Sequence, residues 1–596
     1  MRSRDITIIV VCILIAFGLF VLGGTRLDYI NSQRKEMGLI VNEPLKNAPP
    51  SLAFVTVAMG AFRGLVVDVL WMRAEKMKEE GQFFDAKQLA EWITALQPRF
   101  AAVWDFHSWN MAYNISAAIP ATQPEERWRW VKNGYELIRD RGIELNPKSI
   151  LLYRQMAFIF QHKIGGVSDE AHRYYKLQLA LAMEPLLGPA DNAYFEKLAK
   201  TPSGWQEIVS DGNVAEYVTK LRAADERFGD DDDFVGNYLS FLQKPARFNP
   251  DAFEVRDSYR GTGVLEKFDV FSRAYQLRKV WKLDPVLMEE LNETYGPVDW
   301  RDPNSRLPLD WRHPDVHAIY WAIKGLRVAG KKGVGPGGEG KYSGDETNTD
   351  RMVVHSLQDL FRSGKIYIYS AVEKGPSEDS GEVKRLSQTI FVRPDLRMFK
   401  AYNQQIIKVI EKYTDPNDEE LSSHQIGHRN MLKNAVFSFY QSGHKDEAQK
   451  IYDELRELYP GEESKVPLAL FARKRFIEEL TSLMIFNVRE IVVMLLRESY
   501  FYYAMRDDDE SYGRESLAQD VYDFYNSEFP EGERITLPEF GRLRYLALRD
   551  FLSDRQFPVS LQESLLGRIK IERPKLYEQL KREKAESMKV PAGPEA

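Results

Sequence analysis

A glycine-rich stretch at residues 330–341 is the first segment whose residue types could do chemistry. Gly335, Gly340 and Lys341 have the spacing of a phosphate-binding loop. The next residue is Tyr342, where that motif needs Ser or Thr to hold Mg²⁺. The preceding segment has a helical pattern, whereas a phosphate loop follows a strand and opens a helix. We therefore interpret this stretch as a flexible insertion, and we expect no cofactor.

Two pairs of histidines have the spacing of metal ligands on one helix face. His424 and His428 are four residues apart, as are His313 and His317. The first pair lacks the glutamate that a metalloprotease places beside its first histidine. The second pair contains Pro314, which suits a helix start better than a helix interior. Surface or capping histidines are the better interpretation, and we expect no metal site.

Other catalytic arrangements are not indicated by the sequence. No G-x-S-x-G nucleophile elbow occurs. Carboxylate pairs such as Glu79–Glu80 and Glu419–Glu420 are typical of solvated helix faces. The one cysteine, Cys12, rules out an intrachain disulfide and a cysteine-based zinc site. We therefore expect no catalytic residues and no enzyme activity.

Composition narrows the classes of protein further. The net charge of −7 has no basic bias, so nucleic-acid binding has no electrostatic support. A hydrophobic content of 44% is ample for packed cores. At 596 residues the chain should form about two to four structural units.

The N-terminus contains a candidate membrane anchor. Residues 6–24 carry no charge and would cover roughly 28 Å as a helix, about one bilayer core. Arg2 and Arg4 precede this run, which favours a cytoplasmic start and an exported body. A cleaved signal peptide is the alternative, but the run is long and no A-x-A site follows. The prediction is a single-pass protein of the inner (cytoplasmic) membrane, with its bulk on the periplasmic side.

A second apolar stretch covers residues 52–71. Arg63 and Asp68 would both be costly inside hydrocarbon. We therefore expect a helix that packs on the following helices near the membrane surface. The alternative is a second membrane span, which would return the body to the cytoplasm.

One spacing recurs three times along the chain: a glycine, an alanine five residues later and a proline twelve residues after that. The glycine lets the chain leave a first helix with positive φ, the small alanine lets two helices approach closely, and the proline ends the second helix. The three sets are Gly81, Ala86 and Pro98; Gly443, Ala448 and Pro460; and Gly513, Ala518 and Pro530.

This helix–turn–helix unit of about 34 residues resembles the tetratricopeptide repeat. The copy at 429–460 matches best, and the copy at Gly513 departs from the pattern in its charged lead-in, RDDDE. The resemblance implies an all-α helical-repeat solenoid that serves as a binding scaffold. Two β-rich runs at 366–372 and 387–392 predict a small hairpin in the middle region.

Six of the 11 tryptophans fall between residues 71 and 130. Aromatic residues on the concave face of helical repeats can anchor a peptide or a glycan. The alternative is that they fill the cores between helices or lie at a membrane interface. The predicted partner-binding residues are Trp92, Trp104, Trp109, Asn110, Tyr113, Asn114, Arg127, Trp128, Arg129 and Trp130.

These observations predict a transmembrane helix followed by helical repeats and a charged tail. The expected function is a membrane-anchored scaffold of the cell envelope that binds proteins or peptides. The alternatives are an envelope enzyme or glycan-processing accessory, and a structural homo-oligomer subunit. The predicted regions are 1–25, anchor; 26–66, linker and juxtamembrane helix; 67–190, N-terminal repeats; 191–420, irregular helical middle with the Gly-rich loop (330–350) and the hairpin (366–392); 421–572, C-terminal repeats; and 573–596, flexible tail.

Overall fold

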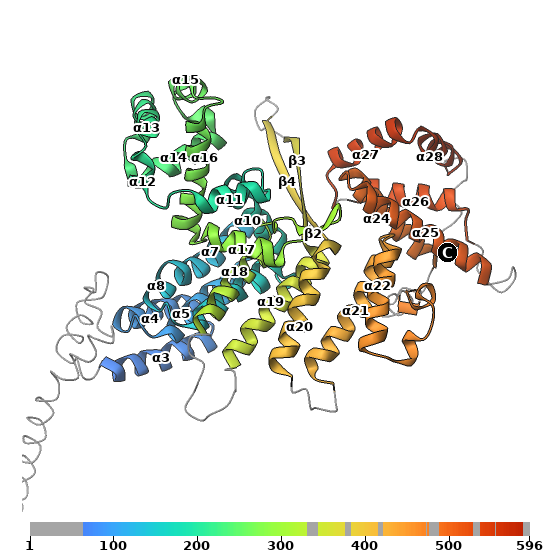
Figure 1. Cartoon of the computed structure of the whole chain (residues 1–596), viewed down its shortest axis with the longest axis horizontal. Coiled ribbons are helices and arrows are strands. Elements are labelled where there is room, and N and C mark those ends of the chain that lie inside the picture. Colours follow the sequence, from blue (N-terminus) through green and yellow to red (C-terminus); the bar gives the residue numbers. More distant parts are fainter. Residues whose placement is uncertain are drawn as a thin grey trace, which may run out of the picture. The chain divides into compact units, whose positions relative to one another are not determined.

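The computed structural model (Figure 1) describes residues 63–329, 344–375, 383–414, 421–472, 474–475, 488–528, 537–554 and 556–587. The predicted transmembrane segment at 6–24 lies outside these residues, as do most of the linker, residues 330–343 of the Gly-rich loop and the end of the tail. In the ranges that are described, no helix is long and apolar enough to cross a bilayer.

The described residues are mostly helical and contain two small antiparallel hairpins. The predicted β-rich runs pair with each other, for example at Ile366 and Val392. The prediction of an all-α fold with a small hairpin in the middle region is therefore confirmed. The strands are β1 (Val298–Asp299), β2 (Asp302–Arg306), β3 (Lys365–Gly375) and β4 (Val383–Arg393).

The chain forms two compact units. The described part of the first unit is 63–159, 168–171 and 324–329, and the second contains the remaining described residues. The helices of the first unit are α3 (Arg63–Glu79), α4 (Phe83–Leu96), α5 (Ala101–Trp109), the π-helix η2 (Asn110–Ile115), α6 (Ser116–Ala118), α7 (Pro124–Leu137), the π-helix η3 (Ile138–Gly142), α8 (Ile143–Leu145) and α9 (Ile150–Phe158).

The first predicted helix pair forms as expected. Gly81 has a φ of +76°, and the amide of Gln82 donates to the carbonyl of Met77, which closes the end of α3. Ala86 is fully buried where α4 packs on α3. The turn glycine and the small alanine therefore have the roles that the spacing predicts.

The second unit contains most of the helices, and α18 ends within the first unit. Its helices are α10 (His172–Leu187), α11 (Asn192–Lys200), α12 (Trp205–Val209), α13 (Gly212–Ala224), η5 (Glu226–Phe228), α14 (Asp231–Gln243), η6 (Pro245–Arg247), α15 (Pro250–Ser258), α16 (Gly263–Gln276), η7 (Leu277–Trp281), α17 (Pro285–Tyr295), α18 (Pro314–Ala329), α19 (Gly344–Ser363), η8 (Leu396–Met398), α20 (Phe399–Tyr413), α21 (Ser423–Gln441), α22 (Lys445–Leu458), η9 (Glu462–Ser464), α24 (Val488–Ala504), α25 (Asp508–Glu528), α26 (Phe540–Ser553), α27 (Val559–Glu572) and α28 (Pro574–Ser587); the π-helix η4 (Ile159–Gly165) begins at the boundary.

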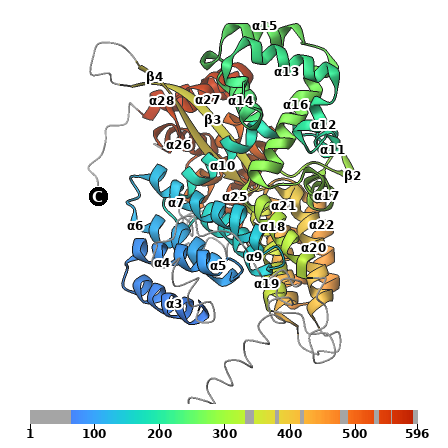
Figure 2. The same ribbon diagram turned by 90° about the vertical axis from the view of Figure 1, so that its left-hand side faces the viewer.

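Helices α19 to α22 lie side by side in chain order (Figure 1), and Figure 2 shows the same group of helices from the side. The turn between α21 and α22 has Gly443 at a φ of +83°, and Ala448 is fully buried in α22. The second predicted pair is therefore also formed at the predicted turn.

The third predicted turn lies elsewhere. The chain turns at Arg506, which has a φ of +63°, and Gly513 lies inside α25. Asp508, Asp509 and Glu510 occupy the first turn of α25. Carboxylates there interact favourably with the helix dipole, so the helix begins before Gly513.

Because a proline usually ends a helix, Pro185 is expected to end the one before it, but it does not. It lies within α10, which continues through Leu186 and Leu187. Both leucines are buried, and the carbonyl of Pro185 accepts a hydrogen bond of 3.0 Å from Nε of Arg273. Tertiary packing therefore outweighs the local cost of the proline.

The β3–β4 hairpin places opposite faces in two different cores. Ile366 and Ile390 pack against Ala180 of α10. Tyr367 and Phe391, on the other face, pack in the C-terminal cluster. Side chains alternate along a strand, so the hairpin joins α10 to the C-terminal helices.

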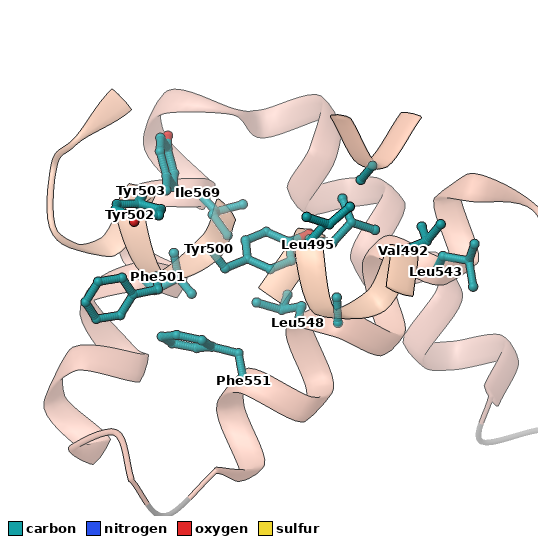
Figure 3. Close-up of a cluster of buried hydrophobic side chains, with 14 of the residues drawn as sticks. Val492, Leu495, Tyr500, Phe501, Tyr502, Tyr503, Leu543, Leu548, Phe551 and Ile569 are labelled. Carbon is teal, nitrogen blue, oxygen red and sulfur yellow. The ribbon is translucent and has the colours of Figure 1, made fainter. Parts of the chain in front are cut away.

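The C-terminal cluster is built by α24, α26 and α27. Figure 3 shows Leu495, Leu548 and Ile569 from these three helices converging on one core. Phe501 reaches the hairpin, where its ring centroid lies 5.1 Å from that of Phe391. This core therefore holds α24 in place beside β4.

Candidate functional site

Three of the ten predicted partner-binding residues are buried in the first unit. The indole Nε1 of Trp104 donates to the Pro98 carbonyl at 2.8 Å. Asn110 is fully buried, and its Nδ2 donates to the Phe83 carbonyl at 2.9 Å. These two side chains hold helix ends together within the unit.

Arg127 is the third buried residue. Its Nη1 lies 3.0 Å from Oδ1 of Asp169, and its Nε donates to the Ile119 carbonyl at 2.7 Å. The side chain of Arg127 is 10% exposed and that of Asp169 is 8% exposed. This is a shielded ion pair that fixes the start of α7.

Six further residues are half-buried, and one is exposed. Trp109 stacks on Tyr113 with ring centroids 4.1 Å apart, and Trp130 meets Phe84 edge-on. Trp92 packs on the core of α3 and α4, and the Trp128 ring lies 6.2 Å from that of Tyr135. Asn114 donates to Asn110. Arg129 is exposed and pairs with Glu126. The ten residues share one unit, and their role in binding a partner stays a prediction.

The prediction of surface histidines is wrong for His313, His317 and His428, which are buried in the second unit because neighbouring helices cover them. Nε2 of His313 lies 3.1 Å from the Ser363 carbonyl, and Nε2 of His317 lies 2.9 Å from the Trp311 carbonyl. Burial lowers the pKa of each to about 4. His428 contacts Tyr459 and Asn403. Among the described residues, no group of three or more His, Cys, Asp or Glu side chains could hold a metal ion.

One charged cavity, which we call the arginine groove, has a volume of about 610 Å³. Residues spaced three or four apart on α24 form one wall, from Glu490 to Phe501, and α26 forms another. The Arg393 guanidinium lies 4.0 Å from the centroid of the Phe501 ring. Its charged side chains are Arg393, Arg489, Arg497, Arg549, Glu490, Glu498 and Asp550.

Acidic side chains lie beside Arg497 and Arg549. Arg497 pairs with Asp554, and Nη2 of Arg549 lies 3.4 Å from Oδ1 of Asp550. The side chain of Arg549, on α26, is 56% exposed. Guanidinium groups beside aromatic rings can bind carboxylates through paired N–H donors, so the groove suits a chain segment that carries carboxylates.

A second cavity, which we call the acidic pocket, has a volume of about 800 Å³. It lies between the loop around β1 and β2, the start of β3 and the start of α25. Asp507 accepts hydrogen bonds from Lys365 at 2.9 Å and from Tyr367 at 2.6 Å. Burial alone would raise the pKa of Asp507, but these two donors outweigh it and hold the pKa below its usual value.

A repeated short motif forms part of the acidic pocket. Residues 297–303 read PVDWRDP, and residues 308–314 read PLDWRHP. In each copy the aspartate accepts the backbone N–H two residues later, at Arg301 and at Arg312. Asp395 and Arg397, which follow β4, form the same turn. The guanidinium of Arg397 also donates two hydrogen bonds to the Asp395 carboxylate.

This motif was not predicted from the sequence, because its spacing differs from that of the helical repeats. The signal was present: two heptapeptides that share Pro, Asp, Trp, Arg and Pro, eleven residues apart. The structure gives their tryptophans different surroundings. Trp300 is 41% exposed at the pocket, whereas Trp311 is fully buried and donates to Asn292.

A buried cluster of titratable groups lies in the second unit, apart from the residues that line the pocket. Burial lowers the pKa of Lys176 to about 8, and its Nζ donates to the Gly166 carbonyl at 2.7 Å. Burial and the charge of Asp359 raise the pKa of Asp315. The arrangement favours a neutral Asp315 in the folded chain.

Comparison with known proteins adds no assignment. No protein-family model matches the chain, and no curated protein matches it.

Proposed function

We propose that this chain is a membrane-anchored scaffold of tetratricopeptide-like helical repeats, which binds a peptide segment of a partner protein within a membrane-associated assembly. Residues 6–24 would anchor it in the inner membrane with its body on the exported side. The observation that carries the binding proposal is the arginine groove. It brings together four arginines and two aromatic rings on β4, α24, α26 and the loop after α26, next to a well-packed core.

The groove favours a partner segment with carboxylates around an apolar residue. Met494 is 37% exposed, and Val493 and Leu546 line the same cavity. Apolar contact would supply binding energy, and the arginines would supply direction through charge-assisted hydrogen bonds. The groove's own acids would disfavour a strongly acidic chain, so a segment with few carboxylates fits best.

An array of ten-residue peptides tests this proposal with the detergent-solubilised full chain. We expect peptides with one or two carboxylates beside a leucine or phenylalanine to bind, and peptides with amides in their place to bind less. Arg549→Glu should weaken this binding at least tenfold. Arg542→Glu is the matched control, because Arg542 is also exposed on α26 but does not line the groove. Equal loss in both variants would count against the groove.

The homo-oligomer alternative has its own measurement. Light scattering of the body from residue 43 onward would give one stable multimer if the repeats stack on each other. A monomer that binds peptides of the array would favour the scaffold.

The enzyme alternative would draw on the acidic pocket, because it is a cavity lined by carboxylates in the middle region and the start of α25. A general acid or base works best when its pKa lies near the working pH. The lowered pKa of Asp507 makes it a poor proton donor or acceptor near neutrality. We therefore favour binding over catalysis at this cavity.

The side of the membrane on which the body lies is decided separately. A reporter fused to the C-terminus, active only in the exported compartment, should give a signal. A signal only from a cytoplasmic reporter would instead support two membrane spans.

A further inference from the structure

The acidic pocket has an excess of negative charge that the groove lacks. Six carboxylates and four basic groups line it. The guanidinium groups of Arg312 and Arg397 each donate two hydrogen bonds to the aspartate of their own turn, with N–O distances of 2.7–2.9 Å. Lys365 donates to Asp507. Three of the four basic groups therefore already donate hydrogen bonds to carboxylates of the protein itself.

Glu510 is a carboxylate of the pocket with an oxygen that lacks a hydrogen-bond donor in the part of the chain that the structure describes. It is 3% exposed and lines the pocket. Its Oε1 accepts no hydrogen bond from the described residues, and Lys365 Nζ lies 3.6 Å from it. Its Oε2 lies 3.9 Å from Nη2 of Arg514. A buried carboxylate oxygen without a donor is costly, so this position favours a ligand that brings an N–H donor.

The rest of the pocket suits an aliphatic chain that ends in a cation. Leu307, Leu360 and Ile366 provide apolar wall beside the carboxylates. Trp300 is 41% exposed at the pocket, and its ring, which also contacts the His444 ring at 4.3 Å between centroids, offers aromatic surface to a cationic group or its stem. Asp509 is exposed and adds a second carboxylate near Glu510 in the first turn of α25.

We propose that the acidic pocket binds a primary ammonium or guanidinium group on an aliphatic chain, with Oε1 of Glu510 as the buried acceptor. Asp509 attracts the cation, and Trp300 covers its stem. The chemistry is that of a lysine or arginine side chain in a peptide, or of a free aliphatic amine. This site is independent of the arginine groove, which would bind carboxylates.

Isothermal titration of the detergent-solubilised full chain tests the inference. The probes are cadaverine, the peptide acetyl-Gly-Lys-Gly-amide and, as a neutral analogue, 1-pentanol. We expect saturable binding of an amine probe and at least tenfold weaker binding of 1-pentanol. Tighter binding of the peptide identifies a protein side chain as the source of the cation, and tighter binding of cadaverine identifies a free amine. Equal binding of 1-pentanol overturns the proposal.

Variants locate the binding. Glu510→Gln keeps the shape of the side chain and should weaken amine binding at least tenfold. Asp509→Asn, at an exposed position, should weaken it several-fold and keeps the test valid if Glu510→Gln does not fold. Asp523→Asn is the matched control, on the same helix and exposed, but outside the pocket. Unchanged binding in Asp509→Asn and in folded Glu510→Gln, or the same loss in Asp523→Asn, overturns the assignment. Failure of the peptide array at the groove leaves these outcomes unaffected.

Discussion

Gly513 lies so close to Ser442 that a Cβ atom on the glycine would be 2.4 Å from the Ser442 carbonyl oxygen. Gly443 follows Ser442 in the turn between α21 and α22, and a Cβ there would lie 3.4 Å from Cα of Gly513. The two glycines that share a repeat spacing in the sequence therefore meet in space. One forms a turn, and the other lets α25 approach that turn.

Replacing Gly513 should destabilise the second unit. In Gly513→Ala the methyl group would overlap backbone, which cannot move as easily as a side chain, so we expect a loss of about 1–3 kcal/mol. Urea unfolding measures this change. Gly567→Ala is the control: Gly567 lies inside α27 with nothing within 4 Å of its Cβ position, and alanine should stabilise the helix by about 0.5–1 kcal/mol. Stabilisation by both substitutions would contradict the close contact.

Arg127 and Arg129 were predicted together as partner-binding residues, and their burial separates them. Arg127→Ala removes the buried guanidinium that pairs with the shielded carboxylate of Asp169, so the free energy of unfolding should fall by about 3–5 kcal/mol. Arg129→Ala removes an exposed pair with Glu126 and should cost about 0–1 kcal/mol. Thermal unfolding of both variants checks this. Equal stability would show that the Arg127 ion pair contributes little.

The buried histidines should make the protein sensitive to acid. Burial lowers the pKa of His317 to about 4 from 6.5. His317 therefore becomes protonated near pH 6.5 in the unfolded chain but only near pH 4 in the folded chain. The contribution of neutral His317 to the free energy of unfolding is complete above pH 6.5 and is lost as the pH falls from 6.5 toward 4. At pH 5 one such histidine lowers the free energy of unfolding by about 2 kcal/mol.

His317→Phe tests this, because a phenyl ring keeps the stacking on Phe160 but cannot take up a proton. The loss of unfolding free energy between pH 7.5 and pH 5 should be smaller in the variant than in the parent chain. An identical loss in both would show that His317 is protonated at the same pH whether folded or unfolded.

Asp315 should have the opposite dependence on pH. Burial and Asp359 raise its pKa, so the folded chain holds this proton more tightly than the unfolded chain. Stability is greatest below the unfolded pKa near 3.8 and falls as the pH rises toward the folded pKa. Asp315→Asn removes this penalty and should raise the free energy of unfolding at pH 8.

Chemical unfolding at pH 5 and pH 8 measures the effect of Asp315→Asn, and the gain should be larger at pH 8. Asp251→Asn is the control, since Asp251 is an exposed residue in the first turn of α15. That substitution should change stability by no more than about 0.5 kcal/mol at either pH. A loss of stability in Asp315→Asn at both values would mean that its carboxylate is needed in the charged form.

The helical fold and the hairpin could be predicted because their signals are local. Apolar residues three or four apart give helices such as α4, and β-branched runs give β3 and β4. Gly81 and Gly443 could be assigned to turns because both follow helical patterns. Gly513 and Pro185 could not be assigned correctly, because neighbouring helices decide their surroundings.

The candidate sites depend on contacts that no single segment contains. The arginine groove takes residues from β4, α24 and α26, and the acidic pocket takes residues from segments more than 200 positions apart, such as Asp299 and Glu510. The repeated PxDWRxP motif was visible, but its exposed Trp300 could not be distinguished from its buried Trp311.

The all-α class, the hairpin and two of the turns follow from the sequence, because backbone conformation depends on local periodicity and on the freedom of glycine. Which charges are buried, which arginines pair with aspartates and which Glu510 oxygen lacks a donor follow only from the folded arrangement. Burial and charge pairing are properties of neighbours in space, and the C-terminal helices and the hairpin become neighbours only when the chain folds.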